Sequence, residues 1–487
     1  MYLGIDLGTS CVKIILLATD GEIIASEVAP LQVSRPQELW SEQNPEDWWT
    51  ATNHAMAALQ ACHSLAQVKA IGLSGQMHGA VVLDNEGHCI RPAILWNDGR
   101  SFKECEELEL LVPNSRRITG NIMMPGFTAP KLKWLQKYEP EHFSRIKKVL
   151  LPKDYLRFRM SGVYASDLSD SAGTLWLDVG QRDWNDELLG ACALTREHMP
   201  TLYEGNEITG YLSAEIAKQW GMNIVPIVAG AGDNAAGAIG MGIIEPQQAM
   251  LSLGTSGVYF AINDNYLSNP ESAVHSFCHA LPNTWHLMSV MLSAAACLDW
   301  VAKLTHYTSV PIMLEDVEKN ATPTGKLIFL PYLSGERTPH NNPNAKGVFF
   351  GMTHDTQRVD LALAVLEGVS FAICDGFAAL HSTGCEPSEI TLIGGGARSA
   401  YWRQMLADIT NKTLTYREGG DVGPALGAAR LAQAAVNTDI NIADLCPKPT
   451  LIQKHTPSAD KSHYYDLKYQ SFNKLYLCLA LMLNESN

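Results

Sequence analysis

The chain carries the stretch Ile5-Asp6-Leu7-Gly8-Thr9-Ser10-Cys11-Val12-Lys13 and repeats its layout as Leu251-Ser252-Leu253-Gly254-Thr255-Ser256-Gly257-Val258-Tyr259. Each stretch is predicted to form a strand, a Leu-Gly-Thr-Ser turn and a second strand. The copies lie about half the chain apart, which indicates two domains of similar topology; chance recurrence of a common turn is the alternative. We therefore expect one domain over residues 1–244 and another over residues 245–487.

The remaining sequence alternates strand and helix patterns in both halves. Helical spacing runs from Trp40 to Leu59, with a good helix start at Asn44-Pro45. Asp421 to Ala435 is rich in alanine and predicts a helix that Gly423-Pro424 opens. The tail closes with an apolar, helix-like segment from Tyr469 to Leu483. Alternating elements of this kind predict α/β layers.

Composition excludes several classes of protein. The 487 residues are 46% hydrophobic and 18% charged, as in globular chains, and the net charge of −15 excludes the basic surface of a nucleic-acid binder. The eleven cysteines form no Cys-x-x-Cys pair, which favours reduced thiols in a cytoplasm. The N-terminus lacks the basic segment of a signal peptide, and the longest apolar stretch, Val225 to Ile244, is interrupted by Asp233 and Asn234. We expect a soluble protein that does not enter the membrane.

The two Gly-Thr-Ser turns are candidates for binding phosphate. Backbone N–H groups in a tight turn with glycine converge into a concavity that holds anions, and the hydroxyls add donors. Asp6, at the end of the first strand, places a carboxylate where Mg²⁺ would sit. The alternative is an ordinary hairpin whose nearby amides satisfy Asp6. Recurrence of the turn favours phosphate.

A third glycine element follows the predicted strand Glu389 to Ile393. Gly394-Gly395-Gly396 forms a loop there, and Ser399 is placed to cap a helix from Tyr401 to Asn411. Glycines allow the backbone to approach a base or ribose closely. The sequence contains no Gly-x4-Gly-Lys-Ser/Thr motif, so the nucleotide site is expected to be of another kind.

Asp233 follows the predicted strand Pro226 to Val228 and lies in a Gly-x-Gly-x-x-Ala sequence that begins at Gly230. That sequence is a weak match to a dinucleotide-binding loop, because Asp233 would occupy the pyrophosphate position and no acidic residue follows about 20 residues later. Two further interpretations are a helix N-cap and a general base at a strand end.

Four residues are candidate metal ligands: His275, Cys278, His279 and His286. Their spacing fits no common zinc pattern, and Val274 to Leu281 is predicted to be a half-buried strand. We therefore do not expect zinc.

Two longer motifs extend the pattern. One is Gly126-Phe127-Thr128-Ala129-Pro130-Lys131-Leu132-Lys133-Trp134-Leu135, and the other runs from Gly347-Val348-Phe349-Phe350-Gly351 through Leu361 to Glu367-Gly368. With these motifs the chain resembles the FGGY family of carbohydrate kinases from residue 1 to about 435. Tyr138 departs from the polar or histidine residue that usually ends the first signature. The resemblance implies two duplicated domains of the ribonuclease-H-like fold, as in actin and the hexokinases, on either side of a catalytic cleft.

Three shorter motifs are most similar to the bacterial xylulokinase branch of that family: Ser74 to Gly79, Ile94 to Arg100 and Leu333 to Pro339. The resemblance implies transfer of phosphate from ATP to D-xylulose, giving D-xylulose 5-phosphate in pentose catabolism, with Asp233 as the general base. It implies a sugar site of Met77, His78, Trp96, Asp98, Asp233 and Asn234. It also implies a nucleotide site of Gly8, Thr9, Ser10, Lys13, Gly254, Thr255, Gly395 and Gly396, and a Mg²⁺ site at Asp6 and Asp233.

Other functions stay open at this point. The sugar could instead be ribulose, gluconate or fuculose, while Met77-His78 disfavours glycerol. From other classes, an actin- or Hsp70-like ATPase and an NAD-dependent dehydrogenase are the alternatives. The expected partners are a small sugar and ATP, with neither nucleic acid nor membrane. A homodimer is compatible with the sequence.

Overall fold

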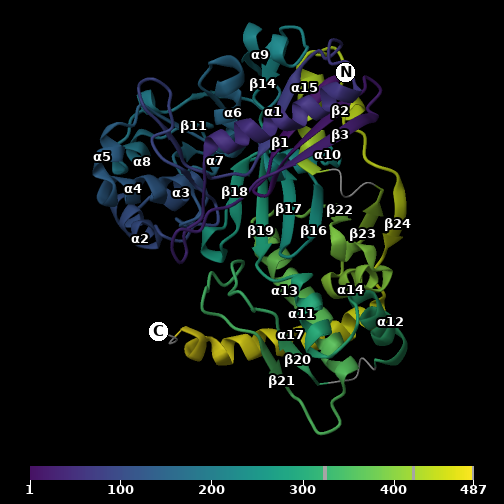
Figure 1. Cartoon of the computed structure of the whole chain (residues 1–487). Coiled ribbons are helices and arrows are strands. Elements are labelled where there is room, and N and C mark those ends of the chain that lie inside the picture. Colours follow the sequence, from purple (N-terminus) through teal and green to yellow (C-terminus); the bar gives the residue numbers. More distant parts are fainter. Residues whose placement is uncertain (322–325, 419–422, 485–487) are drawn as a thin grey trace.

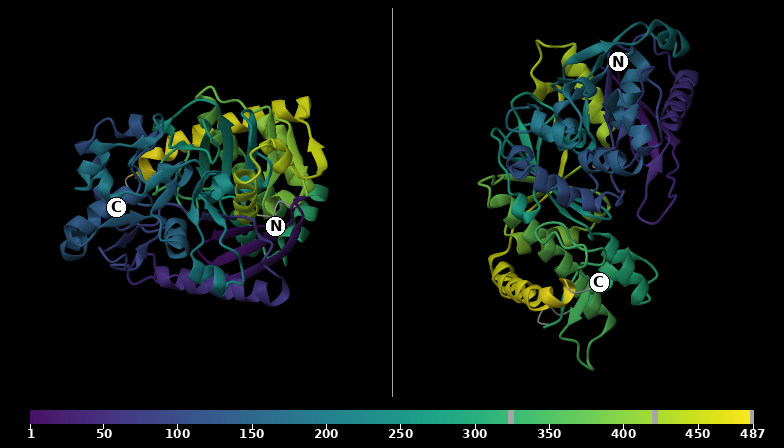
Figure 2. Two further views of the ribbon diagram at one scale, coloured as in Figure 1. Left: turned by 90° about the horizontal axis from the view of Figure 1, so that it is seen from above. Right: turned by 90° about the vertical axis from the view of Figure 1, so that its left-hand side faces the viewer.

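The structure is a computed structural model that describes residues 1–321, 326–418 and 423–484. Two seven-stranded sheets form its framework. Figure 1 shows them in two parts of the molecule, with the N-terminus in the upper part and the C-terminal helix in the lower one, and the side view of Figure 2 shows the same separation. The predicted α/β class is confirmed.

The first sheet has the order β13-β14-β5-β1-β2-β3, with β15 also beside β5. Its central strands β1 and β5 are parallel, whereas β1, β2 and β3 form an antiparallel meander. The bounds are β1 Tyr2–Leu7, β2 Cys11–Leu17, β3 Ile23–Pro30, β5 Ile71–Gly75, β13 Ile208–Tyr211, β14 Pro226–Val228 and β15 Ala231–Gly232.

The second sheet repeats this arrangement, with the order β18-β19-β17-β16-β22-β23-β24. Here β16 and β17 form the antiparallel hairpin and β22 is the parallel neighbour of β16. The bounds are β16 Gln248–Leu253, β17 Gly257–Asn263, β18 His275–Cys278, β19 Trp285–Met291, β22 Glu389–Ile393, β23 Leu414–Arg417 and β24 Leu451–His455. The duplication predicted from the two Leu-Gly-Thr-Ser turns is therefore present in the topology.

Short strands and helices fill the space around the sheets. The paired short strands are β4 Glu42–Gln43, β6 Val81–Leu83, β7 Ala93–Ile94, β8 Lys148–Leu150, β9 Ala165–Asp167, β10 Leu177–Asp178, β11 Asp183–Trp184, β12 Thr201–Tyr203, β20 Ile328–Leu330 and β21 Val348–Phe350. The helices of the first half are α1 Pro45–Cys62, α2 Phe102–Leu111, α3 Ser115–Thr119, α4 Thr128–Tyr138, α5 Pro140–Ser144, α6 Pro152–Ser161, α7 Leu168–Ala172, α8 Asp186–Ala191, α9 Ala214–Gln219 and α10 Asp233–Gly240. Those of the second half are α11 Ala296–Leu304, α12 Val310–Asn320, α13 Arg358–His381, α14 Ala400–Thr410, α15 Gly423–Ala435, α16 Ile442–Leu445 and α17 Ala459–Asn484.

Local signals place several of these helices correctly. Asn44 caps α1, because its side chain accepts a hydrogen bond from the N–H of Glu46. Ser399 caps α14 in the same way through Trp402 N–H. The C-terminal helix α17 begins ten residues before the predicted Tyr469.

Helix α15 lies late in the sequence but packs against the first sheet and α10. Contact is so close that a Cβ on Gly4 would lie 2.0 Å from Ala425 O, and one on Gly72 would lie 1.8 Å from Ala428 O. The predicted start at Gly423 is confirmed, and Asp421 lies outside the described residues. The two spatial halves are thus joined by α15 as well as by the chain near residue 245, and the division at that residue stays a prediction.

Helix α13 is the one described helix long and apolar enough to cross a membrane by length and composition, and 83% of its most apolar window is buried inside the protein. The sequence suggested Val225 to Ile244 as the longest apolar stretch, but among the described residues α13 is the helix that meets this test of length and hydropathy. Burial of this kind is that of a core helix. The eleven cysteines are all free, in agreement with the predicted reduced thiols.

Candidate active site

Two acidic residues meet where neighbouring strands of the first sheet end. Asp6 in β1 pairs with Ser74 in β5, and Ser74 pairs with Ala231 in β15. Asp233 follows β15 and is the first residue of α10. The parallel strand ends therefore bring both carboxylates to one edge of the sheet, although 226 positions separate them in the sequence.

The electrostatics of this pair are unfavourable without a cation. Burial, followed by the negative charge of Asp233, raises the pKa of Asp6 to about 7, against smaller lowering effects from Ser74 and Lys13. Burial also raises the pKa of Asp233 to about 6. Asp6 Oδ1 is buried without a hydrogen-bond partner among the described residues. These features suit two carboxylates that share a positive ligand.

The helix-cap interpretation of Asp233 is wrong by one position. The N-cap of α10 is Gly232, and no side chain caps it. Asp233 Oδ1 instead accepts the backbone N–H of Asn234 at 2.7 Å and its side-chain Nδ2 at 2.9 Å. Oδ2 is left for another partner.

A polar network supports the first Gly-Thr-Ser turn. Thr9 donates its hydroxyl to Gln76 Oε1 at 3.0 Å, and its carbonyl accepts Gln43 Nε2 at 2.8 Å. Trp96 donates Nε1–H to Thr9 Oγ1 at 2.9 Å while 44% of its surface remains exposed. The predicted sugar residue Trp96 therefore contacts the predicted phosphate turn directly.

Met77 and His78 follow β5 and lie on the same side as Asp233. The Met77 side chain packs on Gly232, since a Cβ there would lie 2.9 Å from Met77 Sδ. His78 has a positive φ of 67°, a conformation that costs energy in a residue other than glycine. Two donors hold its carbonyl, the Thr128 hydroxyl at 3.1 Å and Lys131 Nζ at 2.8 Å. Both donors belong to the first of the long signature motifs.

The His78 ring is neutral. Its Nδ1 lies 2.7 Å from Gly173 O, and because a carbonyl only accepts, Nδ1 carries the proton and Nε2 is an acceptor. Burial first, then the charges of Lys131 and Arg337, lowers its pKa to about 3. Arg337 reaches this region from the second half of the chain and donates to His275 Nε2 at 3.2 Å. His275 in turn donates Nδ1–H to Asn121 Oδ1 at 3.0 Å.

Asp98 lies apart from this group in its contacts. Its carboxylate is 2% exposed and accepts Ser41 N–H at 2.6 Å and the Arg100 guanidinium at 2.7 Å. Both oxygens are occupied by protein donors, so the structure gives Asp98 a role in fixing the segment that carries Trp96. Its predicted contact with sugar stays a prediction.

The second turn and the glycine loop lie side by side. Gly254 and Thr255 follow β16, and Gly394, Gly395 and Gly396 follow its parallel neighbour β22. A Cβ on Gly396 would lie 2.6 Å from Trp402, whereas one on Gly395 would meet no atom within 4 Å. Gly395 therefore faces open space, as a residue approached by a ligand must. The loop is a short 3-10 turn rather than irregular chain.

Among the described residues, the histidine-rich strand does not bring three potential metal ligands together. β18 is fully buried rather than half-buried as predicted, and His286 stacks on Phe260 with ring centroids 4.4 Å apart. Burial lowers the pKa of His279 to about 3.

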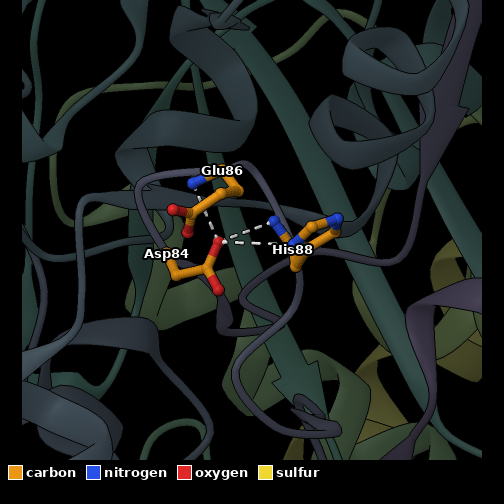
Figure 3. Close-up of side chains that lie close together, drawn as sticks. All are labelled: Asp84, Glu86 and His88. Atoms are coloured by element: carbon orange, nitrogen blue, oxygen red, sulfur yellow. Dashed lines mark hydrogen bonds and ion pairs between the residues drawn. The ribbon is translucent and has the colours of Figure 1, made fainter.

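A separate group, Asp84, Glu86 and His88, has ligand atoms within 4.8 Å of one another (Figure 3). There Asp84 Oδ1 accepts the backbone N–H groups of Glu86 and His88, which makes it the cap of a surface turn.

Comparisons with known proteins identify the family to which this chain belongs. The fold is that of a two-domain α/β kinase of the actin and hexokinase type. Residues 1–240 match the N-terminal domain, and residues 249–436 the C-terminal domain, of the FGGY family of carbohydrate kinases. The chain belongs to this family, whose members use ATP as a substrate. This membership replaces the dehydrogenase and actin-like ATPase hypotheses.

Individual relatives agree with that family. The chain is 62% identical to the xylulose kinase of Escherichia coli K12, covering 98% of both sequences, and 58% identical to that of Klebsiella pneumoniae over 99% of this chain and 100% of the relative. It superposes on the crystal structure of a "xyloylose kinase" from Brucella ovis with a TM-score of 0.95 at 48% identity, over 99% of each chain.

Several residues around the site escaped prediction. Gln43 lies outside every motif quoted above, and Arg337 lies in the quoted motif Leu333 to Pro339, but its contact with His275 follows only from the fold. Thr128 and Lys131 lie in a quoted signature, but their target, the carbonyl of His78, follows only from the fold.

Proposed function

We propose that this enzyme transfers the γ-phosphoryl group of ATP to D-xylulose and forms D-xylulose 5-phosphate. The observation that carries the proposal is the 62% identity to a xylulose kinase along 98% of both chains. The contact of Met77 with the residue before Asp233 supports it, because it places the predicted sugar element beside the predicted base. The eleven free cysteines support a cytoplasmic enzyme.

Asp233 acts as the general base on the attacking hydroxyl, inferred to be O5 of the sugar. With a pKa raised to about 6, the carboxylate is ionised at neutral pH yet basic enough to take a proton in the transition state. Both donors of Asn234 are spent on Oδ1, which leaves Oδ2 for that proton. Phosphoryl transfer has a loose transition state, so the remaining catalysis is alignment and charge neutralisation.

Mg²⁺ fits at Asp6 and Asp233. Hard oxygen ligands are what this ion prefers, and two observations give it a place here: Asp6 Oδ1 has no partner among the described residues, and the charge of Asp233 adds to burial in raising the pKa of Asp6. When bound, it would neutralise charge on the phosphates. Asp6 and Asp233 would hold it directly or through water.

The remaining predicted residues divide between two ligands. The triphosphate lies on Gly8, Thr9, Ser10 and Lys13 of the first turn and on Gly254 and Thr255 of the second, while Gly395 and Gly396 serve the adenosine. The sugar lies against Met77, His78, Trp96, Asp98 and Asn234.

An ADP-release assay tests this function across D-xylulose, ribulose, gluconate, fuculose and glycerol, with a reaction that lacks sugar. D-xylulose is expected to give the highest kcat/KM and an ester at O5 by phosphorus NMR. A higher kcat/KM for another sugar would refute D-xylulose while leaving a sugar kinase. Equal ADP release without sugar would refute both.

A further inference from the structure

A cluster of buried charges lies on α6, β9 and α7, and α7 contacts β15, the strand that leads into α10. At its centre, Lys153 Nζ is 2.7 Å from Asp154 Oδ1, 2.5 Å from Asp167 Oδ2 and 3.1 Å from Asp170 Oδ2. Arg157 Nη1 is 2.7 Å from Asp154 Oδ1. All five side chains are 0% exposed.

Stability does not explain this cluster. Taking charges out of water is costly, and replacing a buried charge network with apolar side chains of equal volume is often neutral or stabilising. Burial lowers the pKa of Lys153, but the three carboxylates outweigh it and raise the pKa overall, so the ammonium stays charged. We therefore asked which groups the cluster holds in place.

One arm of the cluster ends on the backbone next to the base. Asp167 Oδ1 accepts the Ser169 hydroxyl at 2.5 Å, and Ser169 Oγ accepts the backbone N–H of Gly232 at 3.1 Å. A continuous chain of polar contacts therefore runs from Lys153 through Asp167 and Ser169 to the residue that precedes Asp233.

A second arm holds the other end of the same turn. Arg157 donates Nη2–H to the carbonyl of Ala229 and Nη1–H to that of Ala165 at 2.6 Å. Ala229 and Gly232 bracket Gly230, which has a φ of 75° and whose Cβ would lie 1.9 Å from Leu73 O. The turn before Asp233 is thus fixed at both ends and tightly packed between them.

Among the described residues, no residue distant in the sequence donates a hydrogen bond to the Asp233 carboxylate. Both hydrogen bonds to its carboxylate come from Asn234, the next residue. The position of the carboxylate is therefore set by the backbone of residues 229–232. A general base must lie within hydrogen-bond reach of the hydroxyl that it deprotonates, and a misplacement of 1 Å costs about 10²-fold in rate.

We propose that Lys153, Asp167 and Ser169 are positioning residues that aim Asp233 through the Ser169 hydrogen bond to Gly232. This inference rests on the proposed role of Asp233 as the base. The three side chains are buried and the relay ends on the backbone of Gly232, so we expect it to act on kcat and to leave substrate binding nearly unchanged.

Ser169→Ala tests the relay, because it removes both of its hydrogen bonds at this point, the acceptor for Gly232 N–H and the hydroxyl donor to Asp167. Ser169→Thr keeps the hydroxyl and is the rescue variant. Ser171→Ala is the matched control: this serine is in the same helix and equally buried, but its hydroxyl donates to Ser166 at 2.9 Å and not to Asp167, so the hydrogen bond to Gly232 stays intact. Should Ser169→Ala fail to fold, Ser169→Cys keeps the volume with a weaker acceptor and is measured in its place.

We expect Ser169→Ala to lower kcat by about 10-fold to 100-fold, with KM for sugar and ATP within about threefold of the wild type. Ser169→Thr and Ser171→Ala should retain kcat within about twofold, with all melting temperatures close together. Equal kcat values in Ser169→Ala and Ser171→Ala, or KM and melting temperature falling together with kcat, would overturn the relay.

A double-mutant cycle separates this inference from the function on which it rests. If the relay acts through Asp233, then adding Ser169→Ala to Asp233→Asn lowers kcat no further, because the base that it positions is already absent. A full additional loss would show that Ser169 acts elsewhere. High activity of Asp233→Asn alone would instead refute Asp233 as the base. The cycle is run with whichever sugar of the panel gives the fastest turnover, so a wrong sugar does not affect it.

Discussion

Asp233→Asn should raise the stability of the enzyme while removing its activity. The Asn side chain keeps an oxygen for both Asn234 donors, so the local structure is retained. It removes a negative charge that is partly buried and that raises the pKa of Asp6. The ionised carboxylate therefore destabilises the fold, and we attribute its presence to its catalytic role.

The pKa of Asp233 gives the size of that cost. Its rise from 3.8 to about 6 corresponds to about 3 kcal/mol of destabilisation as an upper bound, since each pKa unit is worth about 1.4 kcal/mol. The folded protein binds the proton more tightly than the unfolded chain. The cost is therefore fully present above about pH 6, shrinks as the pH falls and disappears below the unfolded value. At pH 7.5 the variant should melt several degrees above the wild type, and the gap should close towards pH 4.

Asp233→Asn should lower kcat although it raises the melting temperature. General-base catalysis is typically worth about 10² to 10⁴ in rate, so kcat should fall at least ~100-fold while sugar and ATP still bind. Thermal melts of the metal-free protein at several pH values and ADP-release kinetics measure the two effects. Asp84→Asn is the control, because backbone N–H groups lower the pKa of that surface carboxyl, so its removal should give no rise in melting temperature and no loss of kcat.

Two results would refute this reasoning. A variant that retains more than about a tenth of the wild-type kcat would exclude Asp233 as the base. A melting temperature that is unchanged or lower at pH 7.5 would show that the carboxylate is already compensated in the free enzyme.

Four further outcomes are expected. Asp6→Asn should lower kcat strongly and raise the Mg²⁺ requirement, with KM for sugar unchanged; a Mg²⁺ titration that matches the wild type would make Asp6 structural. Trp96→Phe removes the donor to Thr9 and should raise KM for ATP by about fivefold, the worth of one hydrogen bond, while Trp49→Phe should not. The kcat of the wild type should decline below about pH 6 as Asp233 takes up its proton, which a pH–rate profile with no acid limb would contradict. Sugar plus nucleotide should compact the two lobes, and identical scattering dimensions with and without both ligands would exclude closure.

The sequence predicted the elements that depend on local pattern. The repeated Leu-Gly-Thr-Ser turns gave two hairpins at matching places in two sheets, because strand, glycine turn and strand are specified by adjacent residues. Helix α15 was predicted as a helix, yet no local pattern indicates that it packs on the first sheet. That contact depends on Gly4 and Gly72, which lie more than 350 residues away in the chain.

The site was predicted less completely than the fold. Asp6 and Asp233 were singled out because each carboxylate lies at or just after the end of a strand, and the ends of parallel strands meet at one edge of a sheet. The partners that tune them could not be found this way. Lys153 and Asp154 appear in the sequence as the polar first turn of a helix, and their complete burial against Asp167 and Asp170 is a property of the assembled domain.

The backbone is most tightly held around residues whose catalytic form is energetically unfavourable in the folded protein. Burial disfavours the ionised forms of Asp6 and Asp233, and the charge of Asp233 adds to this effect at Asp6. His78 adds a backbone conformation that few side chains adopt. Near each of these positions the backbone is tightly packed or hydrogen-bonded to charged side chains; Gly230, for example, packs directly against the backbone of Leu73. A strained or repelled group persists only where the surroundings over-determine it. We therefore attribute the many glycines and buried charges around the base to one requirement. They hold a reactive carboxylate at a position where its ionised form is energetically unfavourable.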